Sequence, residues 1–320
     1  MSPKCSVIKA IAVSFVMLAA NIAVAQTYPT KPIRIMDGPI GGASDYFARF
    51  IGQGISGPLG QQVIIENRSG IIAGQLVSQA TPDGYTLILA AGTFWIGPLF
   101  QAKPPYDPVN DFSPITITNR SPNVLTVHPS LPVKTVKELI ALAKAKPGAL
   151  NGSTGSNGGS GHIAFELFKS MAGINVARVA YTNGAQEIAD LLSGQMQMTF
   201  GTAVELSPHI KSGRLRAVAV STAQPSALFP SLPTVAASGV PGYEYGSMTA
   251  VFAPAKTPAA IINRLSQEIA RFLRTPEAKE NLLSRGVEAV GSTPEELGNT
   301  VKSEIAKVRK LIKDTGIKVE

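Results

Sequence analysis

Short apolar runs alternate with longer amphipathic stretches along most of the chain. Runs of strand length are expected at 33–36, 63–66, 85–90, 124–127, 177–180, 196–200 and 215–220. Apolar residues at helical spacing fill the segments between these runs. Because strands that alternate with helices in sequence form layered sheets, the pattern predicts an α/β fold.

Several of the expected helices begin with a capping signal. Thr135 is followed three residues later by Glu138, which makes a capping box, and Pro147-Gly148 ends this helix. Three more helix starts combine a threonine N-cap with a proline at the first helical position: Thr257-Pro258, Thr275-Pro276 and Thr293-Pro294.

Residues 1–25 have the features of a secretory signal peptide. Lys4 and Lys9 are basic, residues 10–20 are apolar apart from one serine, and Ala23-Val24-Ala25 supplies small residues for cleavage. The apolar run is too short to span a bilayer, which takes about 20 residues. We therefore expect export, most simply to a Gram-negative periplasm, and removal of Cys5 together with the signal.

Composition excludes several classes of protein. With 44% hydrophobic and 16% charged residues in 320, the chain can form a sizeable core and is not a disordered chain. One Cys and three His exclude a disulfide scaffold and a Cys/His zinc site, and we expect neither a metal nor a cofactor. The net charge of +8 suits nucleic acid, a membrane surface or an anion equally well, but export argues against nucleic acid.

No catalytic motif stands out in the sequence. A Walker loop, a G-x-S-x-G elbow and an H-E-x-x-H helix are all missing. Residues 52–57 match the dinucleotide pattern G-x-G-x-x-G, but they follow a helical stretch and are expected to form a helix C-terminus and turn. His128 is expected to form a hydrogen bond at a strand end, and His209 to begin a short helix, so we expect no enzyme.

Two glycine-rich loops are candidate anion sites. The first is Gly41-Gly42-Ala43-Ser44-Asp45, between a strand and a helix, where free amides and the helix dipole favour a carboxylate; an ordinary turn is the alternative. The second spans 151–161, has five glycines and precedes the amphipathic stretch 162–171; a flexible linker is the alternative. Phe94 and Trp95, near a strand end, either line a pocket or pack in the core.

An ordered series of short motifs connects the chain with a known family. Among them are Tyr28-Pro-Thr-Lys-Pro-Ile33, Pro82-Asp-Gly-Tyr-Thr-Leu87, His128-Pro-Ser130 and Leu232-Pro-Thr-Val235. With these motifs, the whole chain after residue 25 resembles the Bug family of tripartite tricarboxylate transporter receptors, the periplasmic TctC-like solute-binding proteins.

The resemblance implies a type II periplasmic-binding (Venus-flytrap) fold, with two α/β lobes joined by crossing strands. Residues 26–124 plus 249–320 would form lobe 1, and residues 125–248 would form lobe 2. A small organic carboxylate would be captured in the cleft between the lobes and passed to polytopic membrane permease subunits. The receptor itself is expected to be a monomer.

The family's ligand-binding positions carry over to three loops and to two strand ends. They are Gly41, Gly42, Ala43, Ser44 and Asp45; Ala91, Gly92 and Thr93; Thr154, Ser156, Asn157, Gly158, Ser160 and His162; and Tyr181, Gly201 and Thr202. The chain departs from the family pattern at Ile40, where the first loop is one residue shorter, at Thr182-Asn183, which replace Lys-Gly, and at Gly201, which replaces an acidic residue. These departures leave the identity of the carboxylate open.

Two other functions fit the same fold. The closed form could dock on a signalling protein instead of a permease, which would make the protein a ligand sensor. An exported hydrolase is the third reading, and the missing set of nucleophile, base and metal ligands argues against it.

Overall fold

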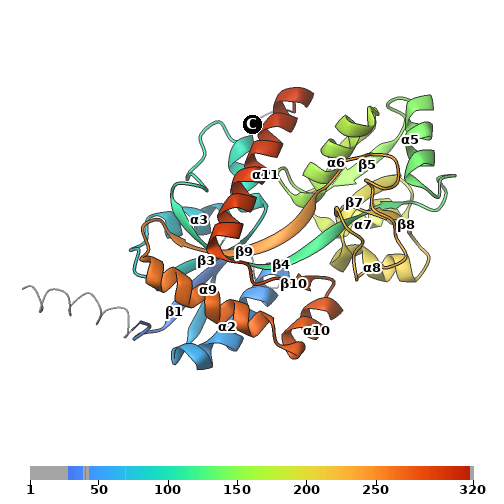
Figure 1. Cartoon of the computed structure of the whole chain (residues 1–320). Coiled ribbons are helices and arrows are strands. Elements are labelled where there is room, and N and C mark those ends of the chain that lie inside the picture. The colour runs from blue at the N-terminus through green and yellow to red at the C-terminus, as the bar shows by residue number, and fades with distance from the viewer. Residues whose placement is uncertain (1–27, 39, 41–42, 69, 318–320) are drawn as a thin grey trace, which may run out of the picture.

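The structure is a computed structural model that describes residues 28–38, 40, 43–68 and 70–317. The expected signal peptide lies outside this range. In the described residues no helix combines the length and the apolar character needed to cross a membrane. The strands follow the order β2-β1-β3-β9-β4-β7-β5-β6 in a sheet that passes through two lobes (Figure 1).

The first lobe is built from both ends of the described chain. Its strands β1, β2 and β3 are parallel, and β10 is a short edge strand. The elements are β1 (Ile33–Asp37), α2 (Ala43–Leu59), β2 (Val63–Asn67), α3 (Gly70–Ser78), β3 (Thr86–Ala91), α4 (Thr93–Ile96), η1 (Gly97–Phe100), α9 (Ala259–Leu273), α10 (Pro276–Ser284), β10 (Glu288–Ala289) and α11 (Pro294–Thr315).

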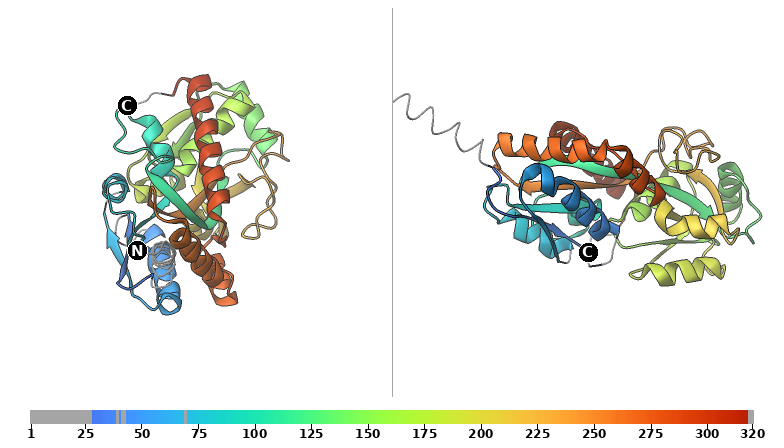
Figure 2. Two further views of the ribbon diagram at one scale, coloured as in Figure 1. Left: turned by 60° about the vertical axis from the view of Figure 1, so that its left-hand side comes forward. Right: turned by 90° about the horizontal axis from the view of Figure 1, so that it is seen from below.

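The second lobe comes from the middle of the chain and repeats the α/β arrangement. Its strand β5 is parallel to β6 and β7. The elements are α5 (Val136–Ala145), β5 (Asn151–Thr154), α6 (Ser160–Ala172), β6 (Ala177–Ala180), α7 (Gly184–Leu192), β7 (Met198–Thr202), α8 (Ala203–Lys211) and β8 (Arg216–Val220). Seen from below, the two lobes lie side by side along the length of the molecule (Figure 2).

Two long antiparallel strands cross between the lobes. They are β4 (Phe112–Val127) and β9 (Gly246–Pro254). The first part of β4, to Pro122, pairs with β9, whereas Asn123 to Val127 pair with β7 of the second lobe. The expected lobe boundaries, at 124/125 and 248/249, therefore fall within these two crossing strands.

Three apolar clusters form the core of the described residues. One packs α2 and α9 over the first-lobe sheet, a second packs α8 in the second lobe, and the largest continues from Phe94 of α4 to Phe165 of α6. Val301, Ile305 and Val308 of α11 belong to this largest cluster. The last long helix therefore contacts apolar residues of both lobes.

All seven predicted strands are present, but the sequence missed β5, β9 and β10. The expected loop at 151–161 in fact begins as β5 and ends inside α6. Asn-Gly-Ser-Thr has low strand propensity, and its pairing with β6 and β7 overrides that propensity. The predicted strand at 124–127 is the end of a strand of 16 residues.

The capping predictions are confirmed at three of four helices. Thr135 and Thr293 form full capping boxes, and Thr275 caps α10. Thr257 does not cap α9: Pro258 is the N-cap residue, and the Thr257 hydroxyl donates to the carbonyl oxygen of Pro254 at 2.8 Å. The Thr257 prediction was wrong because its side chain bonds backward to the end of β9.

Two predictions about short motifs need correction, and a third is confirmed. Residues 52–57 lie in the C-terminal half of α2, as expected for a helix end, but the helix continues to Leu59 and so they form no turn. His209 lies in the last turn of α8 and not at a helix start. His128 makes the expected hydrogen bond at a strand end, with 2.7 Å between its Nδ1 and the Ser130 hydroxyl.

Gly152 in β5 tests how tightly the second lobe is packed. A Cβ atom at this position would lie 2.2 Å from Cε2 of Phe165, a fully buried ring. We expect Gly152→Ala to lower the free energy of unfolding by about 1–3 kcal/mol in a urea titration, because the ring has no space to retreat. The control is Gly184→Ala at the start of α7, where a Cβ atom meets nothing within 4 Å, and it should change the free energy of unfolding little. Equal losses of stability in the two variants would contradict the packing argument.

Candidate functional site

A cavity of about 470 Å³ lies where the two lobes meet, and we call it the interlobe cavity. It is lined at the carboxyl ends of β1 and β3 by Asp37 and Ala91, and from the second lobe by Ser156 and Asn157. The edge formed by the carboxyl ends of parallel strands is where α/β proteins generally place ligands. The topology alone therefore favours this cavity as a binding site.

The first-lobe wall of the interlobe cavity is largely aromatic and apolar. Phe94 and Tyr106 stack with 5.0 Å between ring centroids, and the Tyr106 hydroxyl donates to the Phe94 carbonyl oxygen at 3.0 Å. Ile71, Ile88 and Phe100 also line the cavity. Such a wall suits the carbon skeleton of a small organic molecule.

The second-lobe wall is the loop between β5 and α6. Gly158 has a φ of 78°, and a Cβ atom there would lie 3.1 Å from the Cα atom of Gly97 in η1. Arg178 donates from Nε to the Thr154 hydroxyl at 2.7 Å and from a terminal nitrogen to Asn157 Oδ1 at 2.9 Å. Glycine lets this loop approach the first lobe closely, and Arg178 fixes its shape.

His162 supports the same loop from behind. Its Nδ1 accepts a hydrogen bond from the Gly158 amide at 3.1 Å, and its ring packs on Phe100 at 5.4 Å. Burial, with the cations Arg178 and Lys169 nearby, lowers the pKa of His162 to about 3. The imidazole is therefore neutral at physiological pH and acts by positioning the loop.

The interlobe cavity collects five of the predicted ligand positions, namely Ser44, Ala91, Thr93, Ser156 and Asn157. Gly41 and Gly42 lie outside the described residues. Ala43 begins α2, and Gly92 is the N-cap of α4 between two lining residues.

Other predicted positions are engaged elsewhere. Asp45 accepts hydrogen bonds from Asn67 and Arg49, and Ser160 donates to Asn123 Oδ1 at 3.1 Å. The Tyr181 hydroxyl donates to Asp190 at 2.6 Å, Thr202 forms the capping box of α8, and Gly201 lines a separate cavity beside α7 and α8.

Two of the positions that depart from the family pattern have a clear local setting. Asn183, in place of glycine, caps α7 by accepting from the amide of Ala185 at 2.9 Å. Ile40 is 79% exposed, and so takes no part in the core.

Sequence reasoning missed Asp37, Gln101 and Tyr106 as cavity residues. Asp37 had a usable signal, because it directly follows the apolar run of β1 at the carboxyl end of the strand. Gln101 and Tyr106 follow η1 in an irregular segment, and nothing in the local pattern shows that this segment folds back over the cavity.

The interlobe cavity carries almost no charge. Among its described lining residues there is no lysine, arginine or histidine, and Asp37 is the one carboxyl group. Burial raises the pKa of Tyr106, so that its hydroxyl stays neutral. Nowhere in the described part of the chain do three or more His, Cys, Asp or Glu side chains gather in a way that could hold a metal ion.

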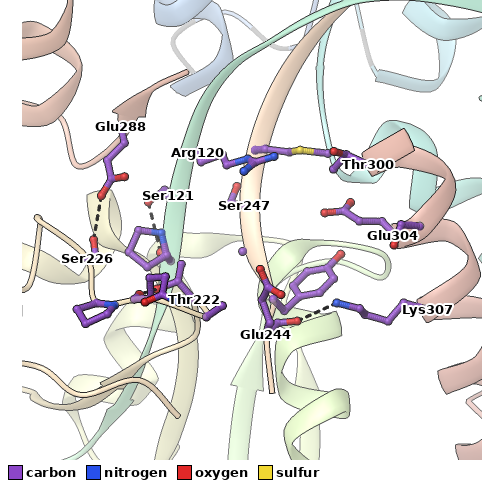
Figure 3. Close-up of a pocket in the computed structure, with 18 of the residues that line it drawn as sticks. Arg120, Ser121, Thr222, Ser226, Glu244, Ser247, Glu288, Thr300, Glu304 and Lys307 are labelled. Atoms are coloured by element: carbon purple, nitrogen blue, oxygen red, sulfur yellow. Dashed lines mark hydrogen bonds between the residues drawn. The ribbon is translucent and has the colours of Figure 1, made fainter. Parts of the chain in front are cut away.

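A second, larger cavity of about 600 Å³ lies between the crossing strands and α11 (Figure 3). Two hydrogen bonds join its walls, from Ser226 to Glu288 and from Lys307 to the Glu244 carbonyl oxygen, both at 3.2 Å. It shares no lining residue with the interlobe cavity.

This second cavity, which we call the hinge-side cavity, is lined by charges of both signs. Glu244, Glu288 and Glu304 line it against the cations Arg120 and Lys307. Glu304 accepts a hydrogen bond from the Trp95 indole at 2.7 Å, which places Trp95 in the core beneath this cavity and away from the interlobe lining. The interlobe cavity is the better candidate for a ligand site, because it lies at the carboxyl ends of β1 and β3 and is lined from both lobes.

Solved structures with the same fold define the class of the protein. Rpa4515 of R. palustris, solved with adipate, is 35% identical with a TM-score of 0.79, and the match covers 90% of this chain and 98% of that one. MatC from Rhodopseudomonas palustris, solved with malate, shares the fold at 24% identity and a TM-score of 0.75, over 89% of this chain and 100% of that one. The fold is that of a two-lobed solute-binding protein.

The sequence comparisons give the family. The profile described as "Tripartite tricarboxylate transporter family receptor" matches residues 47–317, and the chain belongs to this family. Protein BugT of Bordetella pertussis is 30% identical over 302 residues, which cover 92% of this chain and 93% of BugT. A protein encoded in the tcbD-tcbE intergenic region of Pseudomonas sp. strain P51 is 32% identical over 290 residues, 89% of this chain and 86% of that protein.

The lowered pKa of His162 predicts a loss of stability in acid. Between about pH 6.5 and pH 3 the unfolded chain binds a proton at this imidazole and the folded chain does not, so stability falls as the pH falls through this range. We expect His162→Asn, whose amide oxygen can still accept from Gly158, to reduce the change in the free energy of unfolding between pH 7 and pH 5 by about 2 kcal/mol. Denaturant titrations at the two pH values measure this; an unchanged pH dependence would show that His162 is not buried in neutral form.

Proposed function

We propose that this protein is a periplasmic receptor that captures a small organic carboxylate in the interlobe cavity and delivers it to a tripartite tricarboxylate-type membrane permease. The observation that carries the proposal is the cavity itself. It joins polar groups of both lobes, Ser44 and Thr93 on one side and Ser156 and Asn157 on the other, around an apolar wall.

The chemistry of the relatives supports the ligand class. Rpa4515 was solved with adipate and MatC with malate, both of them small dicarboxylic acids. Carbon skeletons of this size fit a cavity of about 470 Å³. A hydrogen bond from an amide or hydroxyl to a carboxylate contributes about 1.5–3 kcal/mol, so a few such donors provide micromolar affinity without an ion pair.

Closure of the two lobes around a ligand would distinguish the loaded receptor from the empty one. A ligand that touches Ser44 in one lobe and Asn157 in the other stabilises the closed arrangement more than an open one. Bending of β4 and β9 is the motion that the topology allows, because these two strands connect the lobes. The closed pair of lobes would then be the surface that the permease recognises.

A thermal-shift screen tests the ligand class. Mono-, di- and tricarboxylates, aromatic acids and amino acids are added to the purified protein that lacks residues 1–25. A carboxylate present at 100 times its Kd should stabilise the protein by about 2.7 kcal/mol and raise Tm by several degrees. A shift with neutral or cationic solutes and with none of the acids would refute the proposal.

Gly158 tests whether the second-lobe loop forms part of the site. Alanine there adds left-handed backbone strain and also presses a Cβ atom against Gly97, whereas Gly173→Ala at the end of α6 adds the strain alone, with nothing within 4 Å. We expect calorimetry to show carboxylate binding at least about tenfold weaker in Gly158→Ala, a change of about 1.4 kcal/mol, and little changed in Gly173→Ala. Equal affinities would remove this loop from the site.

A further inference from the structure

Asp37, the last residue of β1, lines the interlobe cavity and is almost completely buried. The residue is 1% exposed, it lines the cavity, and its Oδ2 accepts a hydrogen bond from the Ser44 hydroxyl at 3.3 Å. Within the described part of the chain its other oxygen, Oδ1, has no hydrogen-bond partner. A buried carboxyl oxygen without a partner is costly, and Asp37 is one of the residues that line the space a ligand would occupy.

The surroundings of Asp37 leave its charge poorly compensated. From α2, the Asp45 carboxylate repels a negative charge on Asp37, and Arg49, which is itself bound to Asp45 at 2.9 Å, attracts it. Glu66 in β2 and Arg68 just after this strand form an ion pair with each other at 2.7 Å. The described residues of β3, α3 and α4 bring no ionisable side chain, and Tyr106 across the cavity is neutral.

We propose that Asp37 binds the ligand carboxylate as a neutral acid, so that this receptor takes up a proton together with its anionic ligand. This inference rests on the proposed function, because it requires a carboxylate in the interlobe cavity. Two carboxylates that share a site of low polarity cannot both stay ionised. One proton between them turns repulsion into a hydrogen bond, in which the Asp37 O–H donates to a ligand oxygen.

The intrinsic acidity of Asp37 agrees with this role. Burial raises the pKa of Asp37 to about 6, while the Gly38 amide and the Ser44 hydroxyl oppose the rise. A bound anion raises this pKa further. Near neutral pH the free receptor therefore holds Asp37 mostly ionised, and binding requires close to one proton from solution.

The test measures affinity and proton uptake together. With a carboxylate found by thermal shift, calorimetry is run from pH 6 to pH 8, and at pH 7 in phosphate and in Tris, whose ionisation enthalpies differ. We expect Kd to rise about fifty-fold from pH 6 to pH 8, and the two buffers to report about 0.9 proton taken up per ligand. The same series run with the variants below shows whether Asp37 is the group that takes up the proton.

Two variants assign the proton to Asp37. Asp37→Asn keeps the shape and supplies a permanent N–H donor, so its affinity at pH 8 should match or exceed that of the wild type, with less than about a twofold change across the pH range. Ser44→Ala removes the donor that favours the ionised form, so the pH at which binding weakens should move upward. Melting curves without ligand confirm that both variants fold.

The alternatives give different results. A carboxylate that binds the wild type equally at pH 6 and pH 8, with the same enthalpy in both buffers, overturns proton uptake and leaves the proposed function intact. Binding that weakens in acid and in Asp37→Asn also overturns it, because Asp37 would then accept a hydrogen bond from a ligand hydroxyl or ammonium group. If no carboxylate binds at any of these pH values and an amine does, the proposed function itself is overturned.

Discussion

The pairing of β4 with both halves of the molecule is the constraint on which the structure depends. Its 16 residues bond to β9 up to Pro122 and to β7 from Asn123 onward. Buried backbone groups must keep their hydrogen bonds, so the lobes cannot separate without breaking a ladder in one of them. The position of the interlobe cavity follows, because the loops after β1, β3 and β5 are brought together across this shared strand.

Layers of polar contacts hold the second-lobe residues of the interlobe cavity, and its described lining includes no lysine or arginine. Arg178 does not line the cavity, yet its hydrogen bonds to Thr154 and Asn157 hold the loop that does. His162 supports that loop as a neutral ring. The guanidinium group of Arg178 is thus hydrogen-bonded, and the loop between β5 and α6 is held in one conformation.

Local signals in the sequence predicted the fold better than the site. The capping boxes at Thr135 and Thr293 depend on residues three positions apart, which is why sequence alone located them. β5 was missed because its Gly152 is a strand residue only through tertiary pairing and through the Phe165 ring that lies against it. In the site, Ser44 and Asn157 lie in the two glycine-rich loops that the sequence alone made candidates, and the family resemblance then named them as ligand positions. Tyr106 enters the cavity through a chain path that no short pattern encodes.

The two lobes also differ in when their chain becomes complete during synthesis. The second-lobe elements β5 to β8 follow one another directly in the sequence. In the first lobe, β3 pairs with β9, and the Trp95 indole bonds to Glu304, and both partners are synthesised much later. A nascent chain folds first where its partners have already emerged. A chain that ended before α11 would have its second-lobe strands paired, but the apolar cluster that α11 covers in both lobes would be exposed. Such an apolar surface is what chaperones and proteases bind.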